Sequence, residues 1–180
     1  MYRIDTLLKL KEKLFHTNDL ALLWGISNKN TLYTTIKRYV QKGILIPVHK
    51  GFYSTVLIDQ INPFKLAIGY LHRFAYVSCE TILIREGVIF QKENNLTLVS
   101  SVSKKFTISN HSYLVRQLKD DYLYYDRGID KVDGVLTANV ERAVADLLYF
   151  NHNYYFDNKK KIDWKKVKKI QKEVGYGRTT

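Results

Sequence analysis

The sequence predicts an α+β protein: a helical N-terminal domain, a small mixed α+β domain and a basic C-terminal helix. Apolar residues recur at helical spacing through the first 43 residues. Short apolar runs between turn signals follow, as expected for strands, and lysine is the commonest residue after position 158. A chain of 180 residues has room for two small domains. The expected boundaries are 1–58 for the first domain, 59–62 for a linker, 63–158 for the second domain and 159–180 for the C-terminal helix.

The N-terminal domain is predicted to contain three helices and a hairpin. Asp5 and Thr17 have the short polar side chains that cap helix N-termini, and Gly25 and Gly43 have the conformational freedom that ends helices. Apolar strands are expected on both sides of a His-Lys-Gly turn. The expected elements are helices at 5–15, 17–25 and 30–43, strands at 44–48 and 52–56, and turns at 27–30 and 49–51.

The third predicted helix, NTLYTTIKRYVQKG, follows a short turn and precedes the hairpin. Helix, turn, helix and hairpin is the order of a winged helix-turn-helix, in which the helix after the turn enters the major groove of DNA. At about 100° per residue, Leu32, Ile36, Tyr39 and Val40 fall on one apolar side. The opposite side carries no acid. Its cations suit phosphates, its short hydroxyls allow close approach, and its Arg and Gln suit base edges.

The predicted DNA-binding residues lie in the turn, on this helix and at the hairpin tip. An ordinary solvated surface helix is the alternative for the helix, although such a face usually mixes both charge signs. A polar turn with Gly51 at positive φ is the alternative for the hairpin tip. The residues are Ser27, Asn28, Lys29, Asn30, Thr31, Tyr33, Thr34, Lys37, Arg38, Gln41, His49 and Lys50.

The charge of the chain is concentrated at its two ends. Net charge is +12, of which residues 1–60 carry +5, residues 61–158 carry none and residues 159–180 carry +7. This balance indicates a polyanionic partner or serves solubility, and solubilising charge would be spread more evenly. The single cysteine, Cys79, cannot form an internal disulfide, and no stretch has the pattern of a signal peptide or a membrane span. We therefore expect a cytoplasmic protein.

The second domain shows no pattern typical of catalysis. Cys79 lies in an apolar segment and is interpreted as a buried structural thiol. The five histidines lack metal-ligand spacing, and no glycine motif for phosphates or dinucleotides is present, so we expect no catalytic residue, metal or cofactor. Arg142 is expected to pair within its helix or between domains. The expected elements are helices at 63–70, from a Ser78 cap to Gly87, and at 139–150, and strands at 96–100, 105–109, 112–117, 122–125 and 129–132.

The C-terminal segment has an apolar side and a lysine side. Ile162, Val167, Ile170 and Val174 recur at helical spacing. The lysine side is interpreted either as a second basic surface, for phosphates or an acidic partner, or as the solvated face of a helix that closes the core. Both interpretations stay open. The lysines are Lys159, Lys160, Lys161, Lys165, Lys166, Lys168, Lys169 and Lys172.

Three segments carry a resemblance to a known family. LFHTNDLALLWGISNKNTLYTTIKRYVQKGILIPVHKGFYS resembles the winged-helix domain of AbiEi-type antitoxins and related transcriptional regulators. NPFKLAIGYLHRFAYVSCETILIREGVI is similar to the start of their second domain, and VLTANVERAVADLLYF to its end, with Asn139 where proline is common. The resemblance covers roughly residues 14 to 150.

The resemblance implies a DNA-binding antitoxin and transcriptional autorepressor of a bacterial abortive-infection operon, a phage-defence system. Its DNA partner would be double-stranded operator repeats, read by Ser27 to Arg38 with His49 to Gly51 as the wing. Its protein partner would be a nucleotidyltransferase-like toxin, countered directly or indirectly. Three alternatives stay open: a solo winged-helix regulator without a toxin, a metal-dependent nuclease that uses the second domain, and a scaffold whose winged helix contacts protein.

Overall fold

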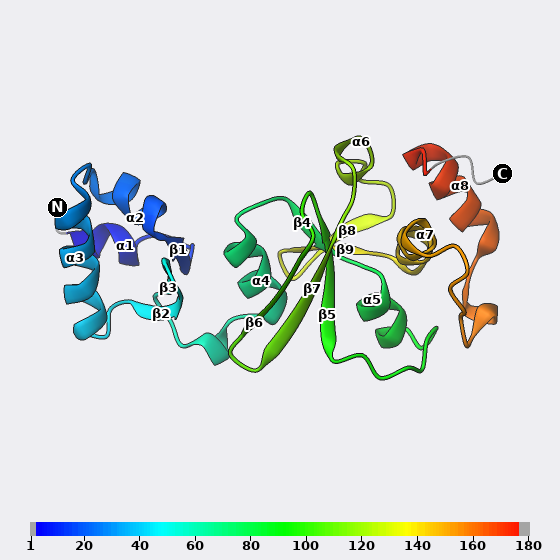
Figure 1. Ribbon diagram of the computed structural model, residues 1–180, viewed down its shortest axis with the longest axis horizontal. Helices are drawn as coiled ribbons and strands as arrows, with labels where there is room; N and C mark the ends of the chain where they lie inside the picture. The colour runs from blue at the N-terminus through cyan, green and yellow to red at the C-terminus, as the bar shows by residue number, and fades with distance from the viewer. Residues whose placement is uncertain (1–2, 177–180) are drawn as a thin grey trace. The chain divides into compact units, whose positions relative to one another are not determined.

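The computed structural model describes residues 3–176, which form an α+β protein with eight α-helices and two sheets (Figure 1). The α+β class predicted from the sequence is therefore confirmed. The chain divides into two compact units, 1–72 and 73–180.

The described part of the first unit contains four α-helices, a short 3-10 helix and three short strands. The strands form one antiparallel sheet in the order β1-β3-β2, with Phe15 of β1 opposite Tyr53 of β3. The core lies between the helices and this sheet and includes Leu20, Leu32 and Ile36, which are almost fully buried. The elements are α1 (Arg3–Leu8), β1 (Leu14–His16), α2 (Thr17–Trp24), α3 (Lys29–Gln41), β2 (Ile46–His49), β3 (Phe52–Ser54), the 3-10 helix η1 (Ile58–Gln60) and α4 (Pro63–Leu71).

The helix predicted from Asp5 to Phe15 was wrong in its second half. The helix ends at Leu8, and residues 14–16 form a strand that pairs with β3. Ladder hydrogen bonds to a distant strand decide the conformation here, because a segment as short as Leu-Phe-His fits a helix or a strand equally well. The cap of α2 is His16 rather than Thr17, and the His16 backbone N–H donates to Asp19 Oδ2 at 2.7 Å.

The first unit extends beyond the linker expected at 59–62. Asn62 caps α4 by accepting from the backbone N–H groups of the next turn, and α4 packs against β1. The His16 imidazole Nε2 lies 2.8 Å from the carbonyl oxygen of Gly69. A Cβ at Gly69 would lie 2.9 Å from Leu14 Cδ1, so glycine allows this close approach. The division between the units follows His72, whose ring stacks on His16 at 4.7 Å.

The second unit consists of a six-stranded mixed sheet and several helices, some of which pack against one another. The strand order is β6-β7-β5-β4-β9-β8, in which β5 runs parallel to β7, β4 runs parallel to β9, and the other pairs are antiparallel. Helix α7 packs against α5 and α8 (Figure 1). The elements are β4 (Ala75–Val77), α5 (Glu80–Arg85), β5 (Asn95–Ser100), β6 (Lys104–Ile108), β7 (His111–Gln117), α6 (Asp120–Leu123), β8 (Ile129–Val132), β9 (Val135–Ala138), α7 (Val140–Phe150), the 3-10 helix η2 (Lys159–Lys161) and α8 (Trp164–Val174).

Most strands and helices predicted after residue 62 are confirmed within about one residue, including α4 in the first unit and β5, β6, β7, β8 and α7 in the second. Two predictions were wrong. Ser78 does not cap α5, since the chain pairs as β4 up to Val77 and Cys79 is the cap position. The strand expected at 122–125 is replaced by the short helix α6, and strand β9 was not predicted.

Candidate nucleic-acid interface

Helix α3 begins at a side-chain cap within the predicted DNA-binding turn. The Asn28 carboxamide oxygen accepts from the Thr31 backbone N–H at 3.1 Å and from the Thr31 hydroxyl at 3.3 Å. This contact satisfies one of the N–H groups that a helix leaves unpaired at its start. Asn28 and Thr31 therefore stabilise the helix, whatever they contact outside it.

The inner side of α3 is packed into the core of the first unit. Leu32 and Ile36 are buried there as predicted, and the Tyr39 ring meets Trp24 edge to face at 5.2 Å. Thr35 is also buried, and its hydroxyl donates to the Thr31 carbonyl oxygen at 2.8 Å. The internal bond lets a polar side chain sit on the buried side, which the apolar pattern alone did not indicate.

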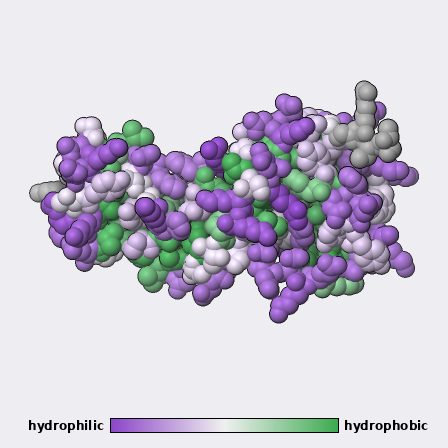
Figure 2. Space-filling model, viewed as in Figure 1, coloured by the Kyte–Doolittle hydropathy of each residue, from purple (hydrophilic) through white to green (hydrophobic). Residues whose placement is uncertain are grey.

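The outer side of α3 is exposed and basic. All twelve residues predicted to bind DNA are exposed, and ten of them lie in the turn before α3 and on α3 itself. Hydrophilic residues cover the side of the first unit along which α3 runs (Figure 2). Among the described residues, no carboxylate lies within 4.0 Å of the charged groups of Lys29, Lys37, Arg38, Lys42 or Lys50.

The absence of acid extends well beyond the helix face. No Asp or Glu occurs between Asp19 and Asp59, a stretch that spans most of α2, all of α3 and the β2–β3 hairpin. Five cations lie within it. No ion pair among residues 3–176 and no acid between positions 19 and 59 therefore neutralises the positive charge of this surface.

The hairpin tip is held against the rest of the first unit. Gly51 has φ 71°, and its carbonyl oxygen accepts from the Thr17 backbone N–H at 2.9 Å and from the Thr17 hydroxyl at 3.2 Å. The His49 ring meets Tyr70 of α4 edge to face at 4.9 Å. Lys50 is exposed at the turn. Of the two predicted hairpin residues, His49 thus has a packing role, whereas Lys50 extends into solvent.

The lysines of the C-terminal segment belong to the second unit. Val167, Ile170 and Val174 are buried where α8 packs on α7, so the interpretation of α8 as a helix that closes the core is confirmed for its apolar side. All eight predicted lysines are exposed. The Lys161 ammonium donates to the Glu86 carbonyl oxygen at 2.8 Å, which leaves the others on η2 and α8 to form the basic side.

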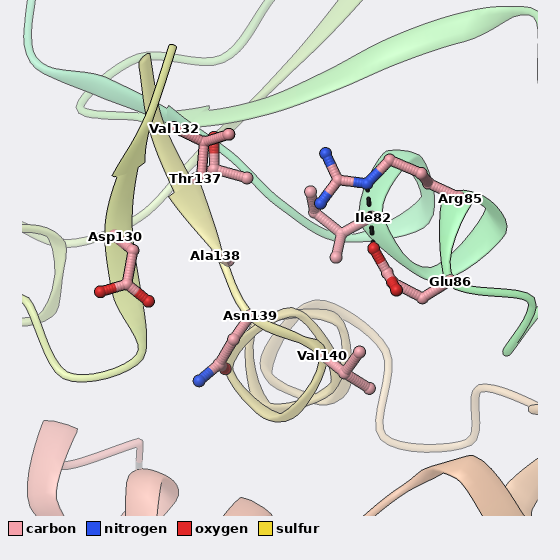
Figure 3. A pocket seen from close by; sticks show the side chains of 9 residues that line it. All are labelled: Ile82, Arg85, Glu86, Asp130, Val132, Thr137, Ala138, Asn139 and Val140. Atoms are coloured by element: carbon pink, nitrogen blue, oxygen red, sulfur yellow. Dashed lines mark hydrogen bonds and ion pairs between the residues drawn. The ribbon is translucent and has the colours of Figure 1, made fainter. Parts of the chain in front are cut away.

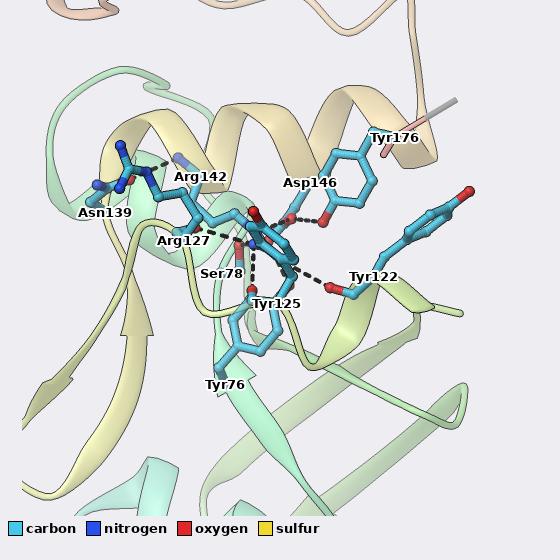
Figure 4. A network of polar contacts seen from close by, with 9 residues as sticks. All are labelled: Tyr76, Ser78, Tyr122, Tyr125, Arg127, Asn139, Arg142, Asp146 and Tyr176. Carbon is cyan, nitrogen blue, oxygen red and sulfur yellow. Dashed lines mark hydrogen bonds and ion pairs between the residues drawn. The ribbon is translucent and has the colours of Figure 1, made fainter. Parts of the chain in front are cut away.

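A buried polar network joins distant segments of the second unit (Figure 4). Arg142 and Asp146 on α7 are both fully buried, and Arg142 Nε donates to Asp146 Oδ1 at 2.8 Å. The predicted pairing of Arg142 within its own helix is therefore confirmed. The other guanidinium nitrogens donate to the Tyr76 hydroxyl and to the carbonyl oxygens of Tyr122, Tyr125 and Arg127.

Asp146 is the acceptor at the centre of this network. It accepts from the Ser78 hydroxyl at 2.6 Å, from the Tyr76 hydroxyl at 3.0 Å and from the Tyr176 hydroxyl. Burial and the Asp146 carboxylate both raise the pKa of Tyr76 and of Tyr176. Burial opposes the charged guanidinium, but Asp146 keeps the pKa of Arg142 above its ordinary value. With every group hydrogen-bonded, this network is structural. Its i, i+4 pair was visible in the sequence, but its tyrosines were not.

Two further features of the second unit are a buried cysteine and a pocket. Cys79 is fully buried, and burial raises the pKa of its thiol, as expected for a structural cysteine. A pocket of about 290 Å³ opens between α5, the β8–β9 hairpin and the start of α7 (Figure 3). Three charged residues line it: Arg85 and Glu86 pair with each other at 3.0 Å, and Asp130 comes from β8. Among residues 3–176, no three His, Cys, Asp or Glu side chains are grouped as metal ligands would be.

Two further findings concern the chain as a whole. No helix in the described part of the chain is both long and apolar enough to cross a bilayer. No protein-family model matches the chain, and no curated protein matches its sequence.

Proposed function

We propose that the chain is a sequence-specific, double-stranded-DNA-binding protein whose first 58 residues act as a winged helix-turn-helix. Helices α2 and α3 with the β2–β3 hairpin follow the order of that motif, which favours α3 as the helix that enters the major groove. The observation that carries the proposal is the exposed side of α3. It bears Lys37, Arg38 and Gln41 and lies in a stretch without a single carboxylate.

Each type of side chain on this surface has a separate role in the proposed complex. Arg38 can donate two hydrogen bonds to guanine O6 and N7, whereas Gln41 can donate to adenine N7 and accept from its N6 amino group. Lys29, Lys37 and Lys50 neutralise backbone phosphates, which sets the register but carries no sequence information. Thr34 is short enough to let the helix approach the base pairs closely. Operator repeats would engage two protomers, or two molecules side by side.

We also propose that this binding represses the protein's own operon and that the protein acts as an antitoxin of an abortive-infection system. This step is supported by the resemblance over roughly residues 14 to 150. Its protein partner would be a nucleotidyltransferase-like toxin, countered by contact or through repression alone. The proposal assigns the chain no catalytic step. An adjacent toxin gene separates the antitoxin from a solo regulator.

The test of DNA reading is a gel shift with the DNA upstream of the protein's own gene, run at two salt concentrations. Lys37→Ala combined with Arg38→Ala removes one phosphate contact and one base-reading contact. We expect the affinity to fall on the order of 100-fold. The slope of log affinity against log salt is expected to fall by about 1 for each lost phosphate contact.

The matched control is Lys119→Ala combined with Lys131→Ala. Both lysines are exposed in the second unit, so the control removes the same charge from another surface. We expect it to leave operator binding nearly unchanged. Equal losses of operator affinity in the two double variants would show that binding depends on the overall charge of the protein and not on α3. Unchanged binding in the α3 variant would overturn the assignment of α3 as the reading helix.

A further inference from the structure

Helix α8 and the segment before it carry more positive charge than the stability of the helix requires. Residues 159–176 contain eight lysines but only two acids, Asp163 and Glu173. Both acids are engaged within the chain. Asp163 caps α8 by accepting from the backbone N–H groups of Lys165 and Lys166, and Glu173 pairs with Arg127 at 3.1 Å and with Lys169 at 3.9 Å.

Three lysines of α8 form an exposed row. Lys165, Lys168 and Lys172 are spaced by three and four residues, so they lie on one side of the helix and span about 10 Å along its axis. Among the described residues, none of the three lies within 4.0 Å of a carboxylate. Like charges at this spacing destabilise a helix, and Lys165 occupies the first turn, where the helix dipole favours anions. An anionic partner would relieve both effects.

Two exposed aromatic side chains, Tyr155 and Trp164, precede this row in the sequence. Tyr155 is 64% exposed, and the Lys159 ammonium lies 5.3 Å from its ring centroid. Trp164 is the first residue of α8 and is 37% exposed, with its ring set edge to face against Phe156 at 5.9 Å. Exposed rings among lysines offer flat apolar surface next to positive charge, which a merely solvated helix face does not need.

We propose that these residues, the α8 basic surface, bind single-stranded nucleic acid. Successive backbone phosphates lie along the lysine row, and unpaired bases stack on the two exposed rings. A duplex keeps its base faces stacked inside, so it would leave the rings unused. The α8 basic surface consists of Tyr155, Lys159, Trp164, Lys165, Lys168 and Lys172.

This inference goes beyond the proposed reading of duplex DNA and does not depend on it. The two surfaces belong to different units and share no residue. They also differ in chemistry. The α3 side combines arginine, glutamine and hydroxyl groups that suit base edges, whereas the α8 basic surface combines lysines, which act as point charges, with aromatic rings.

The experiment measures fluorescence anisotropy of labelled oligo(U), oligo(dT) and a random-sequence duplex with the full chain. The test variant is Lys165→Gln with Lys168→Gln and Lys172→Gln, since glutamine keeps helix propensity close to that of lysine. We expect its affinity for the single strands to fall at least about 10-fold and its log–log salt slope to fall by about 2. The oligo(U) and oligo(dT) arms distinguish RNA from DNA.

Two controls separate this site from other positive charge. The first is Lys105→Gln with Lys119→Gln and Lys131→Gln, which removes the same charge from exposed positions elsewhere in the second unit and should retain single-strand binding. The second is the α3 double variant, Lys37→Ala with Arg38→Ala, which should lose operator binding but retain single-strand binding. Failure of one proposal is therefore distinguishable from failure of the other.

The aromatic part is tested separately. Tyr155→Ala should weaken single-strand binding by about 5- to 150-fold, the effect of losing one stacked base. Tryptophan fluorescence should fall on binding oligo(dT), and the decrease should disappear in Trp164→Phe, which keeps a ring for stacking. The proposal is overturned if both triple variants lose affinity equally, if the α8 variant changes only duplex binding, or if polyglutamate competes as well as the oligonucleotides do.

Discussion

The two units differ in where they hold charged side chains: the first unit exposes them on α3, and the second unit buries two of them on α7. In the first unit, the core is apolar and the cations of α3 point into solvent. In the second unit, the central helix α7 turns Arg142 and Asp146 inward, where both are fully buried. Both helices are amphipathic, and each carries an arginine: Arg38 on α3 and Arg142 on α7. The partners, rather than the residue type, determine what each arginine does.

The difference has a physical consequence for substitutions. A buried ion pair contributes little net stability compared with apolar packing, yet removing one partner leaves an uncompensated charge in the interior. An exposed cation without an ion pair stays hydrated in the folded protein. Removing it therefore changes the stability of the unbound protein very little. Substitutions on α7 should therefore change stability, whereas substitutions on the outer side of α3 should change binding.

The largest effect is expected for Arg142→Met. The apolar side chain leaves the Asp146 carboxylate buried without its cation, so the free energy of unfolding of the second unit should fall by about 3–5 kcal/mol. Hydrogen exchange of the α7 amides measures this loss separately from the first unit.

An exposed arginine in the same unit provides the comparison for this substitution. Arg85→Met removes a half-exposed cation paired with Glu86, and we expect a change within about 0.5 kcal/mol. If both substitutions had equal effects, the network around Asp146 would not be the source of the stability.

A smaller effect is expected at alkaline pH. The pKa values of Tyr76 and Tyr176 are raised in the folded state above the ordinary value of about 10. Their contribution is complete below about pH 10 and is lost as the pH rises towards the raised values, because the unfolded state releases these protons first. Above about pH 10, the second unit should lose about 1.4 kcal/mol per pH unit for each tyrosine.

Tyr176→Phe isolates one of these two contributions. The variant should show a shallower loss of unfolding free energy between about pH 10 and about pH 11, measured by denaturant titration at each pH. Identical slopes before and after the substitution would contradict a role for the Tyr176 hydroxyl.

The smallest effect on stability is expected where the effect on binding is largest. Lys37→Ala with Arg38→Ala should change the free energy of unfolding of the first unit by no more than about 0.5 kcal/mol, since alanine is the best helix former. Asn28→Ala removes the cap of α3 and should cost about 1 kcal/mol. Hydrogen exchange of the α3 amides measures both. A large loss of unfolding free energy in the double variant would show that these cations stabilise the fold, which would contradict their assignment to a binding interface.

The sequence was informative where local signals coincide. The polar turn at 27–30, the apolar spacing of Leu32 and Ile36, and Gly43 together indicate α3, and the structure places the helix within about two residues of that prediction. Strands β5, β6 and β7 were equally visible because each is an apolar run between polar turns.

The missed features depend on partners far away in the chain. Residues 14–16 form a strand only because β3 is available to pair with them. Strands β4 and β9 are neighbours in the sheet and pair in parallel, although they lie far apart in the sequence. Tyr76 reaches Asp146 across 70 positions of sequence. Local periodicity cannot reveal such contacts, since each depends on the tertiary structure as a whole.

The hydrogen bond between Tyr176 and Asp146 also sets the point in synthesis at which the second unit can complete its core. The network in the second unit includes Tyr76 from its first strand and Tyr176 from just after α8, so it cannot close until Tyr176 has been made. The first unit has all its partners by His72 and can fold while the rest is still being translated. The nascent protein therefore carries a finished α3 before its second unit is folded.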